Sequence, residues 1–124
     1  MSKEFFSIEE FKNRWAKVRS SMKSSNIELL MVISPTNINY LIGTPAKGYQ
    51  EFEALLFPID SDPMIMMTRR SEVEMMNDYS LADEVYGWGG QEPEDPIDAL
   101  YKLMSEKNLL NKKIGIEVPY YYLH

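Results

Sequence analysis

The chain has 124 residues, a formal net charge of −6 and no cysteine. This length suits one domain that folds without a covalent staple, and the lack of cysteine excludes disulfides and thiolate metal sites. An acidic chain without a basic stripe is a poor nucleic-acid binder. No apolar run reaches the length of a signal peptide or a membrane span. We therefore expect a soluble, cytoplasmic protein with neither nucleic-acid nor membrane partners.

The first predicted helix begins after Ser7, where Ser7-Ile8-Glu9-Glu10 has the pattern of a capping box. Apolar residues then recur at spacings of three and four, which predicts a single apolar stripe on a helix of about four turns. The stripe consists of Ile8, Phe11, Trp15, Val18 and Met22. Small polar residues at 24–26 end this helix.

A strand over 27–33 is expected to be the starting point from which the sheet is built. Its residues are apolar except for Glu28, which is typical of a strand that is buried on both faces. Ser34 and Pro35 then open a short helix that Gly43 ends. Tyr40 on this helix is interpreted as a core residue.

The rest of the chain alternates further strands and helices. The short Pro- and Asp-containing connection 58–63 predicts an antiparallel hairpin between the second and third strands. Ser71 and Asp95 are the expected caps of the next two helices, and the inward face of the second should carry Ile97, Leu100, Tyr101 and Met104. The strands are predicted at 51–57, 64–68, 84–86 and 114–118, and the helices at 71–79 and 95–108.

The sequence contains few candidate catalytic residues. The single histidine is His124, so a His-based triad or metal site has no residues to build it. Asp60-Ser61-Asp62 is interpreted as a turn rather than a calcium loop. By residue chemistry alone, the chain is an α/β domain without a catalytic set.

Two aromatic residues in predicted loops are the remaining candidates for a site. Tyr49 lies in the Pro- and Gly-containing loop 44–50, and Trp88 lies in the Gly-rich loop 87–94. Loops at strand ends often carry binding residues, and Tyr and Trp often anchor interfaces. Each ring could equally fold back on its own domain as a loop plug, and the sequence leaves both alternatives open.

The order of these segments resembles the N-terminal domain of the creatinase, prolidase and Xaa-Pro aminopeptidase family. The Asn-Ile-x-Tyr-Leu-x-Gly segment and the closing Ile-Gly-Ile-Glu are the most specific parts of the resemblance, which extends over nearly the whole chain. The matching residues are Phe6-Ser7-x-x-Glu10-Phe11-x-x-Arg14, Met22, Ile27-x-Leu29-Leu30, Ser34-Pro35-x-Asn37-Ile38-x-Tyr40-Leu41-x-Gly43 and Ile114-Gly115-Ile116-Glu117.

The resemblance implies a mixed sheet of about five strands with helices on both faces, in a ribonuclease-H-like layout. It also implies that residues 1–124 form one N-terminal domain, and that a C-terminal catalytic domain absent from this chain would carry two divalent metals, often Mn²⁺. We expect no cofactor and no metal in the present chain. The apolar ending Tyr120-Tyr121-Tyr122-Leu123 is costly to leave in water, which favours a chain cut before its next element.

In this family the N-terminal domain builds the dimer and its loops reach the partner's active-site entrance. Tyr49 matches the position of a substrate-facing aromatic residue, and Trp88 matches a Trp-bearing loop with an offset of one residue. The resemblance therefore implies a parent hydrolase for Xaa-Pro peptides or a creatine-like substrate, whereas this chain alone is expected not to be catalytic. The alternative is a free-standing α/β binding or interaction module.

Overall fold

A five-stranded mixed sheet organises the fold. The computed structural model describes residues 7–43 and 52–117. The strand order is β4-β3-β2-β1-β5, with parallel β3–β4 and β1–β5 pairs and with β2 antiparallel to both of its neighbours. The strands are β1 (Leu29–Val32), β2 (Ala54–Pro58), β3 (Ile65–Arg69), β4 (Glu84–Trp88) and β5 (Ile114–Ile116).

The predicted mixed sheet and the antiparallel β2–β3 hairpin are thus confirmed. One expectation about the sheet is wrong, because β2 and not β1 is its central strand. Every residue of β2 is buried, whereas Leu30 of β1 is only partly buried. A run of apolar residues shows that a strand is covered on both faces, but it does not give the strand's place in the order.

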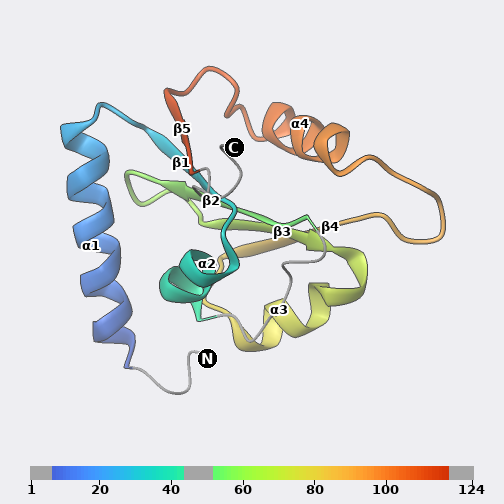
Figure 1. Ribbon diagram of the computed structural model, residues 1–124, viewed down its shortest axis with the longest axis horizontal. Helices are drawn as coiled ribbons and strands as arrows, with labels where there is room; N and C mark the ends of the chain where they lie inside the picture. Colours follow the sequence, from blue (N-terminus) through green and yellow to red (C-terminus); the bar gives the residue numbers. More distant parts are fainter. Residues whose placement is uncertain (1–6, 44–51, 118–124) are drawn as a thin grey trace, which may run out of the picture.

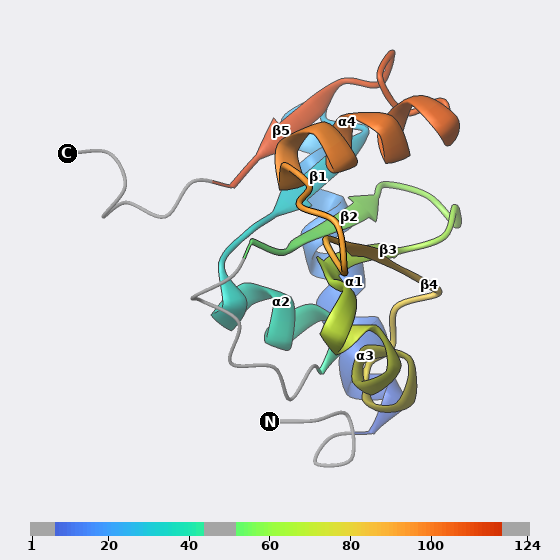
Figure 2. The same ribbon diagram turned by 90° about the vertical axis from the view of Figure 1, so that its right-hand side faces the viewer.

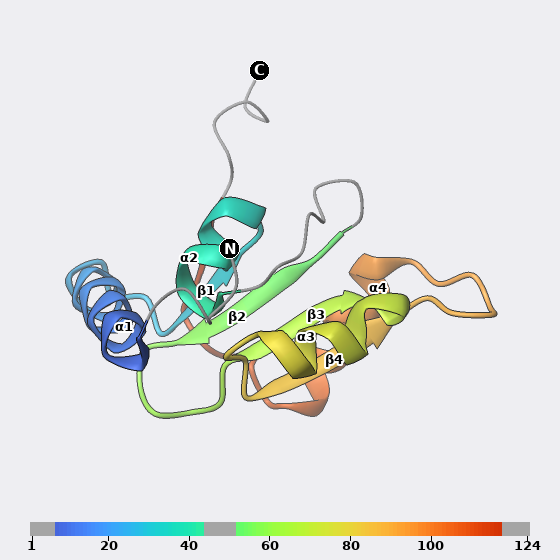
Figure 3. The same cartoon turned by 90° about the horizontal axis from the view of Figure 1, so that it is seen from below.

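Helices cover both faces of the sheet, as expected. α1 (Ile8–Ser24), α2 (Pro35–Ile42) and α3 (Val73–Tyr79) lie on one face, and α4 (Pro96–Glu106) lies on the other (Figure 1). Figure 2 shows the strands between α4 on one side and α2 and α3 on the other. Figure 3 looks towards the first face, with α1, α2 and α3 spread across it. We call these two sides the three-helix face and the α4 face.

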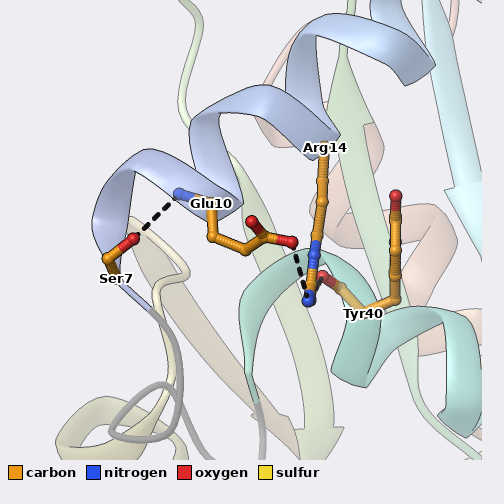
Figure 4. A network of polar contacts seen from close by, with 4 residues as sticks. All are labelled: Ser7, Glu10, Arg14 and Tyr40. Atoms are coloured by element: carbon orange, nitrogen blue, oxygen red, sulfur yellow. Dashed lines mark hydrogen bonds and ion pairs between the residues drawn. The ribbon is translucent and has the colours of Figure 1, made fainter.

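Polar contacts at the start of α1 attach this helix to α2 (Figure 4). The Ser7 hydroxyl accepts a hydrogen bond from the Glu10 backbone N–H at 3.2 Å, so the predicted N-cap is confirmed. The Glu10 carboxylate lies 3.6 Å from the Arg14 guanidinium, which also donates to the Tyr40 carbonyl at 2.8 Å. The guanidinium carbon stands 4.5 Å from the centroid of the Tyr40 ring.

Tyr40 is therefore not the core residue that the sequence predicted. Its exposed fraction is 40%, whereas Ile38, Leu41 and Ile42 of the same helix are buried. In a helix of eight residues only one narrow stripe faces the sheet, and Tyr40 lies beside that stripe under Arg14. Ile8 of the predicted α1 stripe is likewise 46% exposed, because it stands at the first helical position.

The inward face of α4 is also shifted from the predicted one. Leu100 and Met104 are buried as expected, but Ile97 and Tyr101 are 56% and 55% exposed. The buried stripe runs through Ala99, Leu100, Leu103 and Met104, so its centre lies further round the helix. Ile97 and Tyr101 consequently flank the stripe and face outward.

Two local predictions around β4 are wrong. Ser71 does not cap a helix, because Arg70–Glu72 forms a 3₁₀ turn and α3 begins at Val73. Trp88 does not lie in a loop, since β4 continues to Trp88, which pairs with Arg69 of β3. The glycine at position 87 suggested an early strand end, but its backbone passes so close to Arg70 that an added Cβ would lie 2.8 Å from the Arg70 Cα. Glycine is needed there for close packing and not for a turn.

Candidate functional site at the carboxyl edge of the sheet

The carboxyl ends of four parallel-running strands meet at one edge of the sheet. β1, β3, β4 and β5 all end at this edge, and the antiparallel β2 begins there. Open α/β sheets bind ligands in crevices outside the carboxyl ends of their strands. The side chains that this carboxyl edge brings together are therefore the candidates for a binding site.

Trp88 stands at the carboxyl edge as the last residue of β4. Its indole Nε1–H donates to the Phe52 carbonyl at 2.8 Å, and its ring packs partly buried on the α4 face. The Arg69 guanidinium carbon lies 5.9 Å from the ring centroid. Trp88 thus joins the end of β4 to Phe52, two residues before β2, and part of its ring remains accessible beside Arg69.

Glu53 is a buried carboxyl group at the same edge, with an exposed fraction of 4%. It alternates with Ala54, which faces α4, so its side chain lies on the three-helix face. The Thr68 hydroxyl donates to Glu53 Oε2 at 3.4 Å, while Oε1 has no hydrogen-bond partner in the part of the chain that the structure describes. Burial raises the pKa of Glu53, the Thr68 hydrogen bond opposes this change, and the charge of Glu72 adds to it.

Glu117 is a second acidic residue at this edge, directly after β5. Its Oε1 accepts hydrogen bonds from the backbone N–H groups of Ile33 at 3.1 Å and Ser34 at 2.9 Å. Its Oε2 accepts from the Asn37 side-chain amide. The carboxylate therefore caps α2 from a distant part of the sequence, where the Ser34 side chain makes no capping bond.

Two hollows open near this edge. One of about 310 Å³ lies between α1, α2 and β1; its wall is mostly apolar and includes both Asn37 and Glu117. Another of about 480 Å³ lies beyond Trp88 and is more polar. Its lining residues are Arg69, Arg70, Ser71, Glu72, Gly90 and Gln91.

The structure places only one of the two predicted site residues. Trp88 lies at the carboxyl edge, whereas Tyr49 falls outside the described residues. Phe52, the first described residue after that segment, is the hydrogen-bond partner of Trp88. The structure thus connects Trp88 with the described residues that directly precede β2.

Metal ligands do not gather in the part of the chain that the structure describes. Residues 7–43 and 52–117 contain no group of three or more His, Cys, Asp or Glu side chains that could hold a metal ion. The resemblance places the two divalent metals in a C-terminal domain and not in these residues. Within the same residues, no helix is both long and apolar enough to cross a membrane.

Sequence reasoning missed the roles of Glu53 and Glu117. Glu53 interrupts an otherwise apolar run from Phe52 to Phe57, and a charge in such a run signals a buried or functional group. Glu117 closes the Ile-Gly-Ile-Glu segment, but its partners lie more than 80 residues away in the sequence. No local pattern reveals contacts at that separation.

Comparison with known proteins finds one matching family and two curated relatives. The family model described as the Creatinase/Prolidase N-terminal domain matches residues 14–123. Two curated relatives come from Sinorhizobium fredii, and both are described as uncharacterized hydrolase/peptidase. One, y4tL, is 27% identical over 94% of this chain and 32% of its own length; the other, y4tM, is 39% identical over 46% of this chain and 14% of its own length. The chain thus spans at most about a third of either relative.

Solved structures share the fold at lower sequence identity. The N-terminal domain of an Xaa-Pro dipeptidase from Lactobacillus brevis has a TM-score of 0.69 at 18% identity, covering 84% of this chain and 75% of that one. A proline dipeptidase from Streptococcus pneumoniae has a TM-score of 0.67 at 19% identity, covering 83% and 72%. With a family match over most of its length, this chain belongs to the Creatinase/Prolidase N-terminal domain family.

Proposed function

We propose that residues 1–124 are the non-catalytic N-terminal domain of a longer hydrolase of the Xaa-Pro dipeptidase, aminopeptidase or creatinase type. The observation that carries this proposal is the match of this chain to the Creatinase/Prolidase N-terminal domain family. The chain spans only 32% of the length of a relative that is described as a hydrolase/peptidase. The reacting groups, with two divalent metals if the parent is a peptidase, would then belong to a C-terminal domain. The described residues supply no metal-ligand cluster for them.

A comparison of a short and a long protein tests this proposal. The 124-residue chain and the protein made from the longest reading frame that contains it would be assayed with Mn²⁺ on Xaa-Pro dipeptides, longer Xaa-Pro peptides and creatine. We expect hydrolysis by the long protein and none by the short one. Turnover by the short chain would contradict the proposal, and a reading frame that stops near His124 would favour a free-standing interaction module.

The proposal also assigns this domain a role in assembly and in shaping the active-site entrance. We expect a cytoplasmic homodimer in which the carboxyl edge lies at the partner's substrate entrance. There Tyr49 and Trp88 would exclude water and restrict substrate length without transferring protons. Support comes from the position of Trp88, whose partly accessible ring lies beside Arg69 at the edge where α/β sheets bind ligands.

Two tryptophans offer a matched test of this role. Trp15 and Trp88 each donate an indole N–H to a backbone carbonyl, of Leu41 at 2.7 Å and of Phe52 at 2.8 Å. In the long protein, Tyr49→Ala and Trp88→Phe should change the ratio of kcat/KM between a dipeptide and a longer peptide, whereas Trp15→Phe should leave this ratio unchanged. Unchanged ratios for both Tyr49→Ala and Trp88→Phe would remove the entrance role.

A further inference from the structure

Arg70 is an exposed arginine whose side chain is held by backbone along most of its length. The Gly87 backbone lies against its base, where an added Cβ would come within 3.2 Å of the Arg70 Cβ. The Gly90 backbone lies against its far end, where an added Cβ would come within 3.1 Å of both Cδ and Nε. Between them, the Nε–H donates to the Gly89 carbonyl at 3.2 Å. The direction of the guanidinium is therefore fixed by three glycine backbones and not by a carboxylate.

The other edge of this guanidinium is open. Its two terminal amino groups have no hydrogen-bond or ion-pair partner within residues 7–43 and 52–117, whereas the Arg14 and Lys107 side chains each pair with a glutamate. The planar guanidinium can bind both oxygens of one carboxylate or phosphate through two parallel hydrogen bonds. A group that is already oriented also loses less conformational entropy on binding. Arg70 is thus prepared to receive an anion.

The space beside Arg70 is large enough for a small ligand. Arg70 lines the more polar hollow of about 480 Å³, which we call the arginine hollow. Arg69 lies in the same wall, with its guanidinium carbon 5.9 Å from the centroid of the Trp88 ring, and Ser71 and Gln91 add neutral polar groups. Ligand pockets commonly have volumes of about 300–1,000 Å³. The arginine hollow therefore combines two cations with room for a ligand at the carboxyl edge.

The charges around the arginine hollow favour an anion with a single charge. Arg69 and Arg70 contribute two positive charges and Glu72 one negative charge, so the lining residues have a net charge of +1. A carboxylate carries one negative charge, whereas a phosphate group carries about −1.5 to −2 at neutral pH and is repelled more strongly by Glu72. The composition of the wall thus suits a carboxylate better than a phosphate.

From these observations we propose that the arginine hollow is a carboxylate-binding site, in which the terminal amino groups of Arg70 bind both oxygens. Arg69 adds positive charge beside Trp88, and Glu72 disfavours doubly charged anions. The site belongs to the 124-residue chain and goes beyond the proposed function. Only the source of the carboxylate, which we assign to the C-terminus of a short peptide, rests on that function.

Two ligands that differ in one group test the site. N-acetylproline has a free carboxylate, and N-acetylprolinamide has a neutral amide in its place. The 124-residue chain would be titrated with each ligand while NMR follows the Arg70 Nε–H and the Gly90 amide. We expect saturable shifts with N-acetylproline and none with N-acetylprolinamide. Equal shifts with the two ligands, or no shift with either, would overturn the proposal.

Substitutions separate a specific site from general attraction to positive charge. Arg70→Gln should weaken N-acetylproline binding about 10- to 100-fold, because it removes hydrogen bonds to a charged group. Arg70→Lys should also weaken it, because an ammonium group cannot hold two oxygens in one plane. Arg19→Gln is the matched control: Arg19 Nε donates to the Pro58 carbonyl at 3.0 Å, but Arg19 does not line the arginine hollow. An equal loss in Arg19→Gln would overturn the proposal.

Glu72→Gln tests the preference for a carboxylate. In the original chain, inorganic phosphate should bind more weakly than N-acetylproline. Glu72→Gln should tighten the binding of both by up to about fivefold, as expected for one exposed charge, and phosphate should gain more. Phosphate binding that is as tight as that of N-acetylproline in the original chain would overturn the assignment to a carboxylate.

Gly90→Ala is a second route to the same site if Arg70→Gln does not fold. The added methyl group would press on the Arg70 side chain at a backbone φ of +123°, so it should weaken N-acetylproline binding while the guanidinium is kept. Unchanged binding in Gly90→Ala would contradict the role of the glycine backbone in orienting Arg70. None of these measurements uses hydrolysis, so the carboxylate site and the proposed function can fail independently.

Discussion

The two faces of the sheet are completed to different extents. On the three-helix face, α1, α2 and α3 cover residues such as Leu55, Phe57 and Met66, which are fully buried. On the α4 face a single helix covers the corresponding residues, and Phe52, Tyr86 and Trp88 remain only partly buried. In the described chain, accessible aromatic surface on the sheet therefore gathers where one helix has to cover a whole face. The three-helix face keeps accessible apolar surface at Leu30 and the hollow of about 310 Å³, whereas the α4 face keeps it at these three aromatic rings.

Substitutions in the central strand β2 should have the largest effects, and they test whether both faces of the sheet are buried cores. Phe57 packs on the three-helix face and Leu56 on the α4 face, and both have exposed fractions of 0%. Phe57→Ala should lower the free energy of unfolding by about 3–5 kcal/mol and Leu56→Ala by about 2–5 kcal/mol, since each leaves a cavity. Urea denaturation measures both values.

Ile97→Ala is the control for these two substitutions, because Ile97 is 56% exposed and should cost much less. A small loss for Leu56→Ala beside a large one for Phe57→Ala would show that the α4 face is not a core at all. The comparison of the two faces would then have to be abandoned.

The two indole N–H groups allow the two faces to be compared through smaller changes in the free energy of unfolding. Trp15 lies on the three-helix face and Trp88 on the α4 face, and each satisfies one backbone carbonyl. Phenylalanine at either position leaves that carbonyl without its donor, so we expect each variant to lose about 1–3 kcal/mol of unfolding free energy. A loss for Trp15→Phe alone would mean that the Phe52 carbonyl finds water or another donor.

Much of this architecture could be predicted from the sequence, because its signals are local. The Ser7 cap, the Pro35 and Pro96 helix starts and the hairpin after β2 depend on neighbouring residues, and the structure confirms them. Some of the predictions that proved wrong depend on distant neighbours. Tyr40 lies beside the buried stripe of α2, and Arg14 of another helix packs on its ring.

The candidate site could be predicted less well than the fold, for the same reason. The Gly-rich pattern predicts Trp88 in a loop, whereas it ends β4, and its bond to Phe52 joins residues that are 36 positions apart. The capping of α2 by Glu117 spans more than 80 positions. Hydrophobic periodicity reports which face of an element is buried, but it does not report which polar groups meet at a sheet edge.

The pH dependence of folding stability tests the burial of Glu53 on the three-helix face. Its folded-state pKa is raised, chiefly by burial, so the folded chain binds more protons than the unfolded chain at pH values above the ordinary carboxyl pKa. Stability should therefore fall as the pH rises from the ordinary carboxyl pKa to the raised one, and the lost stability is not regained above it. Glu53→Gln should remove this decline and stabilise the chain at neutral pH.

Thermal unfolding of both proteins between pH 4 and pH 8 would measure the effect of this substitution. Asp60 is a suitable comparison, because a backbone hydrogen bond from Asp62 lowers its pKa and gives its contribution the opposite sign. Parallel stability curves for the original chain and Glu53→Gln would contradict the assignment of a raised pKa to Glu53.

Ile116 gives the smallest expected effect in the isolated domain and the clearest distinction between the two faces. It follows Ile114 by two residues on β5, so both side chains lie on the α4 face, but Ile116 is 57% exposed. Ile116→Ser should change the free energy of unfolding of the 124-residue chain by about 0.5 kcal/mol or less, as is usual for surface substitutions. If the proposed C-terminal domain or a second copy packs on this face, the same substitution should measurably lower the unfolding temperature or weaken the dimer of the long protein, because there it would place a hydroxyl in an apolar contact. Equal effects in the short and long proteins, by denaturation and sedimentation, would mean that the open part of the α4 face is ordinary surface and that the domain contact lies elsewhere.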